Sequence, residues 1–580
     1  MAIPFSSFSF PNGGGEHIWS FDVVRNYPRT VRHHIGAFPR DRNNNCYMCQ
    51  APKLIGFEGA TPGKDLEIAP TFSAGYSEER ENETSGPMKK KDSSANPGIT
   101  AKWSITSNMM LSATLNPDFS QVEADAAQMD INTRFPLYYS EKRPFFLEGA
   151  DMFSTHANLV HTRTLAEPDW GIKLTGREGK HTMGFFTVRD NVTPLMFPGS
   201  EGADNTTLSM QSTGTVLRYK YDLGESSNIG VVMTDREGTD YHNRVAGIDG
   251  SLNISQKDQI NFMVIGTNTS YSDYIVKEFD QPGSDFGGAA YGAGYNRDTE
   301  NYHFDGSYIE LTPDFRTDIG FQTRTGYKES KVGGEYRWRQ GPGHWYTSIS
   351  IQGRHNWRGD FNGNPLYNAF QSRLNYNGPL QSYMGLNSEY GHNWYEGVKY
   401  RSNYVNLSSG FNPTGSSRVY LNINTGDQID YTNKRAGKTF SINPGFNQNI
   451  GRHLYVSANH RYQRLTVDPG PLFDANVSNF RVKYQFTRRA FLRVNLQYVD
   501  YDRNTENYIE EERDDVDANS TSLFSQMLFS YEINPQTVFY LGYSDNYRNR
   551  NYIDQRGRFD DSLTQTNRAF FTKIGYAWLP

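Results

Sequence analysis

Cysteine occurs only twice in this chain, as the pair Cys46-x-x-Cys49. Such a pair can be a redox couple, half of a zinc site or a simple disulfide, whereas attachment of a c-type haem would require a histidine where the chain has Gln50. A zinc site needs two further ligands, and His33 and His34 are the nearby candidates. In an oxidising compartment a disulfide within a short loop is the simplest interpretation, so we expect Cys46 and Cys49 to be joined, with redox and metal roles as alternatives.

Glu123 and Asp125 stand two positions apart and would share one face of an extended segment, a spacing that could serve acid–base chemistry. Ion pairing with arginines is the simpler interpretation of the same two carboxylates. The signatures of nucleophilic and zinc-dependent hydrolases, G-x-S-x-G and H-E-x-x-H, do not occur. We therefore expect no catalytic residue, no enzymatic activity and no bound cofactor or metal.

The composition limits which elements can position these residues. Of the 580 residues 14% are aromatic and the net charge is only -6, which is not the composition of a disordered chain. The mean hydropathy of -0.72, without any stretch near 18 consecutive apolar residues, excludes a helical membrane protein. The near balance of 58 basic and 64 acidic residues gives no nucleic-acid footprint. A transmembrane β-barrel satisfies all three observations, because only every second residue of its strands meets lipid.

Alternation of apolar and polar residues runs through most of the chain. Residues 213–223 place Leu217 and Tyr219 on one face, with Arg218 and Lys220 on the other. The same period-two pattern covers 345–354, 454–461 and 490–498, and it continues to the end, where Phe570, Thr572, Ile574, Tyr576 and Trp578 share a face. One such strand fits a soluble sheet, but about two dozen in succession, without a linker or helical period, predict a barrel.

The connections between these strands support the same prediction. Short turns near 224–227, 255–258, 377–380 and 449–452 alternate with longer polar segments near 191–207, 313–329, 466–475 and 503–518. Bacterial barrels have short periplasmic turns and longer outer loops, so we expect this alternation to hold without error. Counting from residue 66 gives about 24 strands, roughly 22 to 26, an even number that places both termini in the periplasm.

Residues 116–156 are the least barrel-like part of the chain, because they combine many charges with aromatic residues. Facing lipid near the midplane, each charge would cost about 2–4 kcal/mol. We therefore expect this segment to fold into the lumen, where its charges pair with those of the wall. The candidates for a lumenal constriction are its charged residues, Glu123, Asp125, Asp130, Arg134, Glu141, Lys142, Arg143 and Glu148.

Residues 1–65 have a different character, with Gly13 to Gly15 and the polar run 41–45 predicting a loop-rich periplasmic segment. No basic start, apolar stretch or cleavage site follows Met1. Since an outer-membrane protein needs an export signal, we expect this chain to be mature, trimmed or the C-terminal part of a longer protein.

Two charged segments lie in predicted outer loops. Residues 510–517 are strongly acidic, and 515–519 resemble the start of a calcium loop, but glycine at the sixth place and glutamate at the twelfth are missing. A solvated loop is the default interpretation, and divalent cations that bridge it to lipopolysaccharide phosphates are the alternative. Lys89, Lys90 and Lys91 could contact those phosphates directly.

Two motifs indicate a family. The stretches LNPDFSQVEAD at 115–125 and EKRPFFLEG at 141–149 resemble the signature of a family of uncharacterised bacterial outer-membrane barrels, and DWG at 169–171 with KLTG at 173–176 adds to the likeness. In that family the barrel usually follows a periplasmic domain similar to family 9 carbohydrate-binding modules. Residues 3–29 resemble the closing strands of that module, most of which these 580 residues lack. The resemblance implies location and architecture and brings no established reaction.

Together these observations predict an all-β, porin-like antiparallel barrel in the outer membrane of a Gram-negative bacterium, formed by residues 66–580, with a periplasmic segment at 1–65 and a lumenal insert at 116–156. At about 24 strands such a barrel is wide enough to need filling.

We expect a passive or gated conduit for a bulky solute or polymer, possibly carbohydrate-related. The alternative is a structural sheath or assembly platform that holds a periplasmic or lumenal protein partner, including an electron-transfer protein. An outer-membrane hydrolase comes third. The expected partners besides protein are outer-membrane lipid and lipopolysaccharide, and no nucleic acid.

Overall fold

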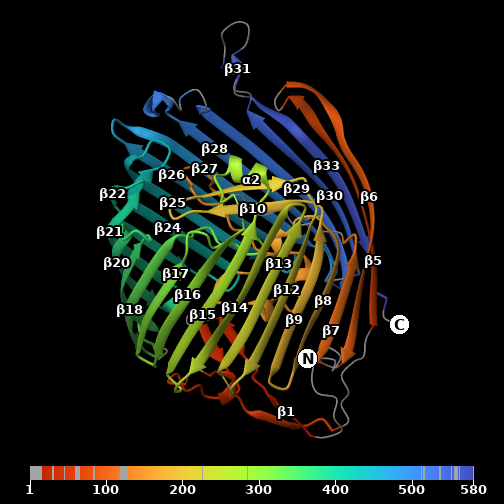
Figure 1. Cartoon of the computed structure of the whole chain (residues 1–580), viewed down its shortest axis with the longest axis vertical. Coiled ribbons are helices and arrows are strands. Elements are labelled where there is room, and N and C mark those ends of the chain that lie inside the picture. Colours follow the sequence, from red (N-terminus) through yellow and green to blue (C-terminus); the bar gives the residue numbers. More distant parts are fainter. Residues whose placement is uncertain are drawn as a thin grey trace.

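The structure, a computed structural model, describes residues 16–28, 32–44, 46–58, 66–82, 85–106, 108–117, 128–224, 226–283, 285–341, 343–510, 513, 516–534, 537–549, 552–553, 559–560 and 562–578. A closed antiparallel barrel of 24 strands dominates it (Figure 1). The predicted all-β barrel and its strand number are confirmed. Among the residues described, no helix is long and apolar enough to cross a membrane.

The barrel strands follow one another in chain order and each pairs with its sequence neighbours. β22 and β23 form two parts of one strand, because both pair with β21. The strands are β5 (Leu66–Asn82), β6 (Ser85–Thr106), β7 (Met109–Leu115), β8 (Pro168–Glu178), β9 (His181–Asp190), β12 (Ser212–Asp222), β13 (Asn228–Gly238), β14 (Tyr241–Asn253), β15 (Asp258–Ser270), β16 (Phe286–Asp298), β17 (Tyr302–Leu311), β18 (Tyr327–Arg339), β19 (Ser348–Gly359), β20 (Pro365–Asn377), β21 (Tyr383–Tyr395), β22 (Val398–Arg401), β23 (Tyr404–Phe411), β24 (Ser417–Asp430), β25 (Arg435–Ile450), β26 (Leu454–Val467), β27 (Pro471–Gln485), β28 (Ala490–Arg503), β29 (Asn519–Asn534), β30 (Thr537–Asn549) and β33 (Leu563–Gly575).

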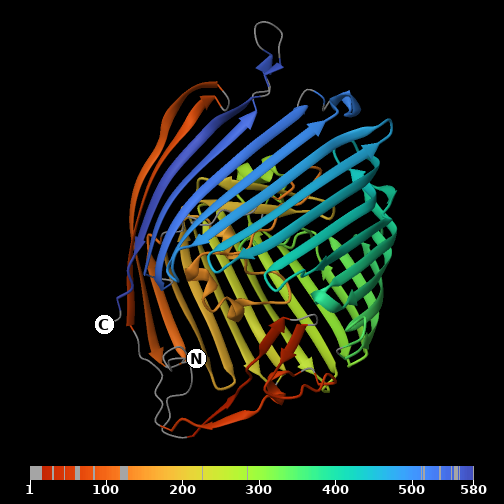
Figure 2. The ribbon, with the colours of Figure 1, turned by 180° about the vertical axis from the view of Figure 1, so that it is seen from behind.

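The first and last barrel strands close the wall. β33 pairs with β5 in a register that runs from Thr71 opposite Gly575 to Glu79 opposite Asn567. We call the end at which β5 begins the lower end and the opposite end the upper end. The described residues before β5 lie below the lower end (Figure 2).

The wall has an apolar outer face and a polar inner face. Leu217 on β12 is 42% exposed, whereas its neighbours Val216 and Arg218 are 0% and 3% exposed. Phe570, Ile574, Tyr576 and Trp578 are likewise exposed at the end of the chain, as the alternation predicts. Because large apolar side chains exposed on every second position of a closed barrel match a lipid-facing surface, the fold is of the transmembrane type.

The expected alternation of short and long connections does not hold throughout. At the upper end, two residues connect β13 to β14 and two connect β21 to β22. These tight turns are allowed because Asp240, Glu396 and Gly397 adopt positive φ angles of 53°, 49° and 77°. The lower connection between β18 and β19 is longer, from residue 340 to 347.

Several upper connections fold into the barrel instead of outward (Figures 1 and 2). We call residues 128–167, 191–211, 271–283 and 312–326 the plug. It contains α1 (Pro144–Leu147), η3 (Ala150–Phe153), η4 (Thr162–Thr164), α2 (Asp273–Glu278) and the hairpin of β10 (Thr193–Pro198) with β11 (Ala203–Leu208). The predicted insert thus forms only one part of the material that fills the lumen.

The remaining elements lie outside the wall. Below the lower end, β1 (His17–Ser20) pairs with β4 (Lys53–Gly56), and β2 (Arg25–Pro28) pairs with β3 (Arg32–Ile35). The short η2 (Met48–Gln50) lies between β3 and β4 in sequence. The connections of the barrel add η5 (Pro379–Gln381), η6 (Thr505–Asn507), β31 (Tyr552–Ile553) and β32 (Phe559–Asp560).

Candidate functional site: a plug inside the barrel

The plug packs against β8, β9 and β12 through a buried apolar cluster. Phe145, Phe146 and Phe153 of the insert meet Phe186, Val188 and Val216 of the wall. Lumen-facing glycines make room for this contact. A Cβ at Gly184 would lie 2.8 Å from the Phe153 ring, and one at Gly214 would lie 2.9 Å from the Leu165 side chain. Close approach of the plug to the wall therefore requires glycine at these positions.

Glu141 and Arg143 form the polar centre of the insert. The Arg143 guanidinium donates to both carboxylate oxygens of Glu141 at 2.9 and 2.7 Å and to the Leu165 carbonyl at 2.6 Å, and the Thr162 hydroxyl donates to Glu141 at 2.6 Å. Burial opposes ionisation of Glu141, but the hydrogen bonds and the charge of Arg143 outweigh it and lower the pKa of Glu141 to about 2. The pair folds the chain between 141 and 165 back on itself.

A single wall residue, Arg236 of β13, holds three plug segments. Its side chain is fully buried and donates to the carbonyls of Pro194 at 2.8 Å, Asp318 at 3.1 Å and Thr164 at 3.2 Å. The Asp190 carboxylate lies 3.6 Å away and provides the countercharge. A guanidinium suits this position, because it presents five donors in one plane.

The loop between β17 and β18 is fixed by its own buried carboxylate. Asp318 accepts hydrogen bonds from the hydroxyls of Tyr241 at 2.7 Å and Tyr271 at 3.2 Å, and its backbone N–H donates to Asn243 at 2.9 Å. Burial raises the pKa of Asp318, against the lowering effect of these hydroxyls and of Arg236. Phe315 and Ile319 are fully buried beside it, so this loop is a structural part of the plug.

The insert is also tied to β6 and β8. Lys102 forms an ion pair with the Glu148 carboxylate at 2.5 Å, and the buried Lys173 ammonium donates to the Glu148 carbonyl at 2.7 Å and to that of Phe145. The two wall lysines therefore hold the short α1 from below.

On the opposite side the insert reaches β24 and β28. The Tyr501 hydroxyl donates to Asp130 at 2.7 Å. Asn132 donates to the Ile429 carbonyl at 2.9 Å and accepts from the Tyr431 N–H at 3.0 Å. Met129 and Ile131 pack on the buried cluster at the upper ends of β26 to β28. The insert thus spans the lumen from one wall to the other.

The six candidate constriction residues that the structure describes lie at different places in the plug. Glu141 and Arg143 lie inside the insert, Glu148 and Asp130 bind opposite walls, and Lys142 lies half-buried beside Glu141. Arg134 stacks on the rings of Phe135, Tyr395 and Tyr431 at the upper surface. Glu123 and Asp125 fall outside the described residues.

Sequence reasoning missed Arg236 and Asp318. Arg236 looks like any inward polar residue of a strand, and Asp318 stands in a segment that predicts an outer loop. The signal that could have found this loop is Phe315 and Ile319, since two large apolar residues do not suit a solvated connection.

Cavities remain on both sides of the plug. At the upper surface a cavity of about 980 Å³ lies between the insert, β10, the end of α2 and the 313–316 loop. A smaller one of about 280 Å³ adjoins it and reaches Asp318. On the lower side an open cavity of about 560 Å³ lies between β6 to β8 and residues 148–152. The plug therefore narrows the lumen without filling it.

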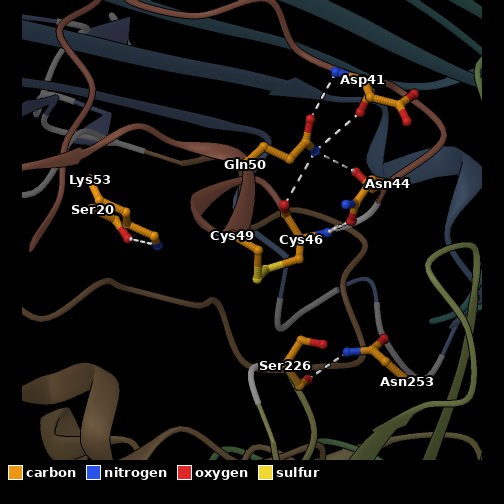
Figure 3. Close-up of a disulfide and its surroundings, with 9 residues drawn as sticks. All are labelled: Ser20, Asp41, Asn44, Cys46, Cys49, Gln50, Lys53, Ser226 and Asn253. Carbon is orange, nitrogen blue, oxygen red and sulfur yellow. Dashed lines mark hydrogen bonds between the residues drawn. A yellow bond between two sulfur atoms is a disulfide. The ribbon is translucent and has the colours of Figure 1, made fainter. Parts of the chain in front are cut away.

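Below the barrel, Cys46 and Cys49 are joined in a disulfide. Figure 3 shows the Gln50 amide directed at the surrounding loop, where it donates to the carbonyls of Asp41 and Asn44 at 3.1 Å each. The loop contacts the barrel through Asn43, whose side-chain oxygen accepts from the Glu300 N–H at 3.2 Å. Among the described residues no group of histidine, cysteine and carboxylate side chains could hold a metal, and the side chains of His33 and His34 lie outside them.

Comparison with known families finds one match. A family described as a domain of unknown function (DUF5916) matches residues 62–171, which is less than half of the chain and includes both sequence motifs and the insert. None of the curated proteins compared with the chain matches it.

Solved barrels resemble the structure loosely. The siderophore receptor PirA from Acinetobacter baumannii is 7% identical with a TM-score of 0.42, over 91% of this chain and 82% of that one. OprD from Pseudomonas aeruginosa is 9% identical with a TM-score of 0.32, over 69% and 94%. OmpT from Vibrio cholerae is 12% identical with a TM-score of 0.24, over 69% and 99%. At these values the neighbours carry no inference about a ligand. The closed barrel with its apolar outer face defines the class by itself: the chain is a β-barrel of the outer-membrane type.

Proposed function

We propose that this barrel is a gated conduit for a bulky hydrophilic solute or polymer across the outer membrane of a Gram-negative bacterium. The observation that carries the proposal is the plug, which spans a 24-stranded lumen yet leaves cavities above and below it. A barrel of this size without a filling would be an open channel, so the plug sets what passes.

In this proposal the lower end faces the periplasm and both termini lie there. The lengths of the connections support this orientation, because the long ones, such as 191–211 and 312–326, lie at the upper end, where outer-membrane barrels have their extracellular loops. The carbohydrate-related solute is proposed from the family resemblance, in which a carbohydrate-binding module usually precedes the barrel; these 580 residues lack most of that module, so the module itself assigns no carbohydrate binding to them. Lipopolysaccharide is the expected partner at the upper end. There Lys89 and Lys91 pair with Glu81 and Glu79, so their charge is already balanced by the neighbouring strand.

Removal of residues 116–156 and replacement by a short Gly-Ser linker tests the conduit. We expect single-channel conductance in planar bilayers to rise several-fold, because the insert bridges the lumen. The matched control is Cys46→Ser with Cys49→Ser, which alters the chain outside the lumen and should conduct as the parent does. An unchanged conductance of the deletion variant, with the barrel intact, would contradict the proposal.

The lower lumen favours a second candidate, a sheath or assembly platform that holds a protein. Its wall carries a cavity of about 390 Å³ lined by Glu335, Arg337, Arg339 and polar side chains of β19 to β23. Purification in a mild detergent distinguishes the two functions. A stoichiometric partner, and visible haem absorbance in the case of an electron-transfer protein, would favour the sheath, and a chain purified alone would favour the conduit. The sequence motifs G-x-S-x-G and H-E-x-x-H do not occur, and enzymatic activity is not part of either proposal.

A further inference from the structure

The upper cavity has the size and composition of a ligand site. Five parts of the chain line it: residues 133–137, 197–205, 279–282 and 313–316, and Tyr395 of β21. Its volume of about 980 Å³ is near the upper end of the range of about 300–1,000 Å³ for small-molecule sites. Because the segments are held by Arg236, Asp318 and Asn132, the cavity is a fixed feature of the plug.

Neither guanidinium group of the cavity, Arg134 nor Arg316, forms an ion pair within contact distance among the described residues. Arg134 is held by ring contacts alone, with centroids of Phe135, Tyr395 and Tyr431 at 5.1, 5.5 and 4.8 Å, and its Nη1 is buried with no acceptor. Arg316 donates only to neutral acceptors, the Gln281 side chain at 2.9 Å and the Pro313 carbonyl at 2.8 Å among them. A buried donor without an acceptor is costly, so an oxygen-rich ligand would be favoured there.

Carboxylates line the same cavity. Asp204, Asp280 and Asp314 lie on its wall with exposed side chains, and within the described part of the chain none of them forms an ion pair. The amides of Asn205 and Gln281 add further donors and acceptors. Phe197 and Phe279, with ring centroids 4.6 Å apart, give it an apolar surface.

This lining discriminates between ligand charges. An anion would meet the three aspartates, and a cation would meet Arg134 and Arg316. A neutral solute with many hydroxyl groups satisfies both sets, because each hydroxyl donates to a carboxylate and accepts from a guanidinium, while the C–H faces of a sugar ring cover aromatic rings.

We propose that the upper cavity binds a neutral oligosaccharide, as the entry site for the solute of the conduit. The proposal rests on the conduit function for its purpose, and on the lining alone for its chemistry. The smaller cavity shares Pro136, Leu137, Pro198 and Asn205 with it, so a bound solute would lie next to a second space in the plug.

Titration calorimetry on the full chain tests the proposal. The detergent should be an amine oxide, because the head group of an alkyl glycoside would compete for the site. The probes are maltohexaose, cellohexaose and chitohexaose, with hexaglutamate and hexalysine as charged comparators. We expect at least one hexasaccharide to bind and neither peptide to do so. Binding of a peptide in place of every sugar, or no heat with any hexasaccharide, would overturn the proposal.

Variants assign the binding to this cavity. Asp204→Asn keeps the shape and removes a charged acceptor, and Arg134→Gln removes the unpaired donor. We expect each to weaken the hexasaccharide by about tenfold or more, as loss of a hydrogen bond to a charged group predicts. Glu335→Gln, in the lower lumen, should bind as the parent does. Equal affinity of Asp204→Asn and the parent would place the sugar elsewhere and overturn the assignment.

The two proposals fail separately. Conductance of the insert deletion in bilayers reports on the conduit, whereas calorimetry in detergent reports on the cavity. A conductance that rises in the deletion variant, together with a parent chain that binds no hexasaccharide, would keep the conduit and end the oligosaccharide site.

Discussion

Arg236→Met should loosen the plug while the barrel remains intact. The substitution keeps an unbranched side chain at a fully buried position but removes the donors to Ser212 and to the carbonyls of Pro194, Thr164 and Asp318. At about 1 kcal/mol for each acceptor left without this donor, the loss is about 4 kcal/mol, within the range of about 3–5 kcal/mol for breaking a buried ionic contact. The strand pairing of β13 with β12 and β14 does not use the side chain, so the barrel ladder should persist.

Trypsin cleavage within the plug measures this loss, because Arg163 lies in the segment that Arg236 holds. A loss of about 4 kcal/mol raises the open population by up to about a thousandfold, and the cleavage rate should follow it. The matched control is Arg244→Met on β14, whose half-exposed guanidinium pairs with Asp235 at 3.3 Å and should contribute at most about 1 kcal/mol. Equal cleavage of Arg236→Met and the parent would refute the assignment of Arg236 as the main anchor.

Two further predictions concern the same plug. Gly184→Ala would place a Cβ 2.8 Å from the Phe153 ring and should destabilise the plug by about 1–3 kcal/mol in thermal unfolding. The control is Gly266→Ala, which has open space at its Cβ and should not change the stability. Equal melting temperatures of the two variants would contradict the close packing of Phe153 on Gly184. Glu141, with a pKa lowered from 4.5 to about 2, contributes stability that is complete above pH 4.5 and is lost as the pH falls towards 2, a change of about 3 kcal/mol. Opening of the plug, measured as conductance noise in planar bilayers, should therefore increase in the parent as the pH falls below 4.5. If a Glu141→Gln variant showed the same increase, the pH dependence would not come from Glu141.

The wall could be predicted from the sequence because its physics is local. A strand that separates lipid from water shows the separation in its own residues, as Leu217 and Arg218 do, and each strand repeats it. The density of charge in 116–156 was likewise enough to predict that this segment lies in the lumen, since Glu141 and Arg143 cannot face lipid. Connection length was a weaker signal, because two residues with positive φ, such as Glu396 and Gly397, can replace an outer loop.

The plug could not be predicted to the same extent because its contacts join distant segments. Arg236 donates hydrogen bonds to Thr164, Pro194 and Asp318, and these four residues are tens of residues apart in sequence. The sequence around each of the four residues gives no sign of the other three. The charges of the insert were found as a set, but which of them bind the wall and which bind each other depends on where the chain turns back, at the Glu141–Arg143 pair.

The plug is attached more strongly to the β8–β13 side of the barrel wall than to the β24–β28 side. This difference decides on which side a passage can open. Towards β8 to β13 the plug is held by the apolar cluster around Phe153, by Arg236 and by Lys173, all buried. Towards β24 to β28 the described residues of the plug are held by the hydrogen bonds of Asp130 and Asn132, by two apolar side chains and by Arg134, which stacks on Tyr431. The neutral hydrogen bonds of Asn132 contribute about 1 kcal/mol each, and the bond that Tyr501 donates to the Asp130 carboxylate contributes about 1.5–3 kcal/mol. Because this is less than the Arg236 contacts and the buried apolar cluster contribute together, separation from the second wall costs least. A solute that leaves the upper cavity, which Tyr395 borders on that side, would therefore pass between residues 129–132 and the β24–β28 wall while the rest of the plug stays in place.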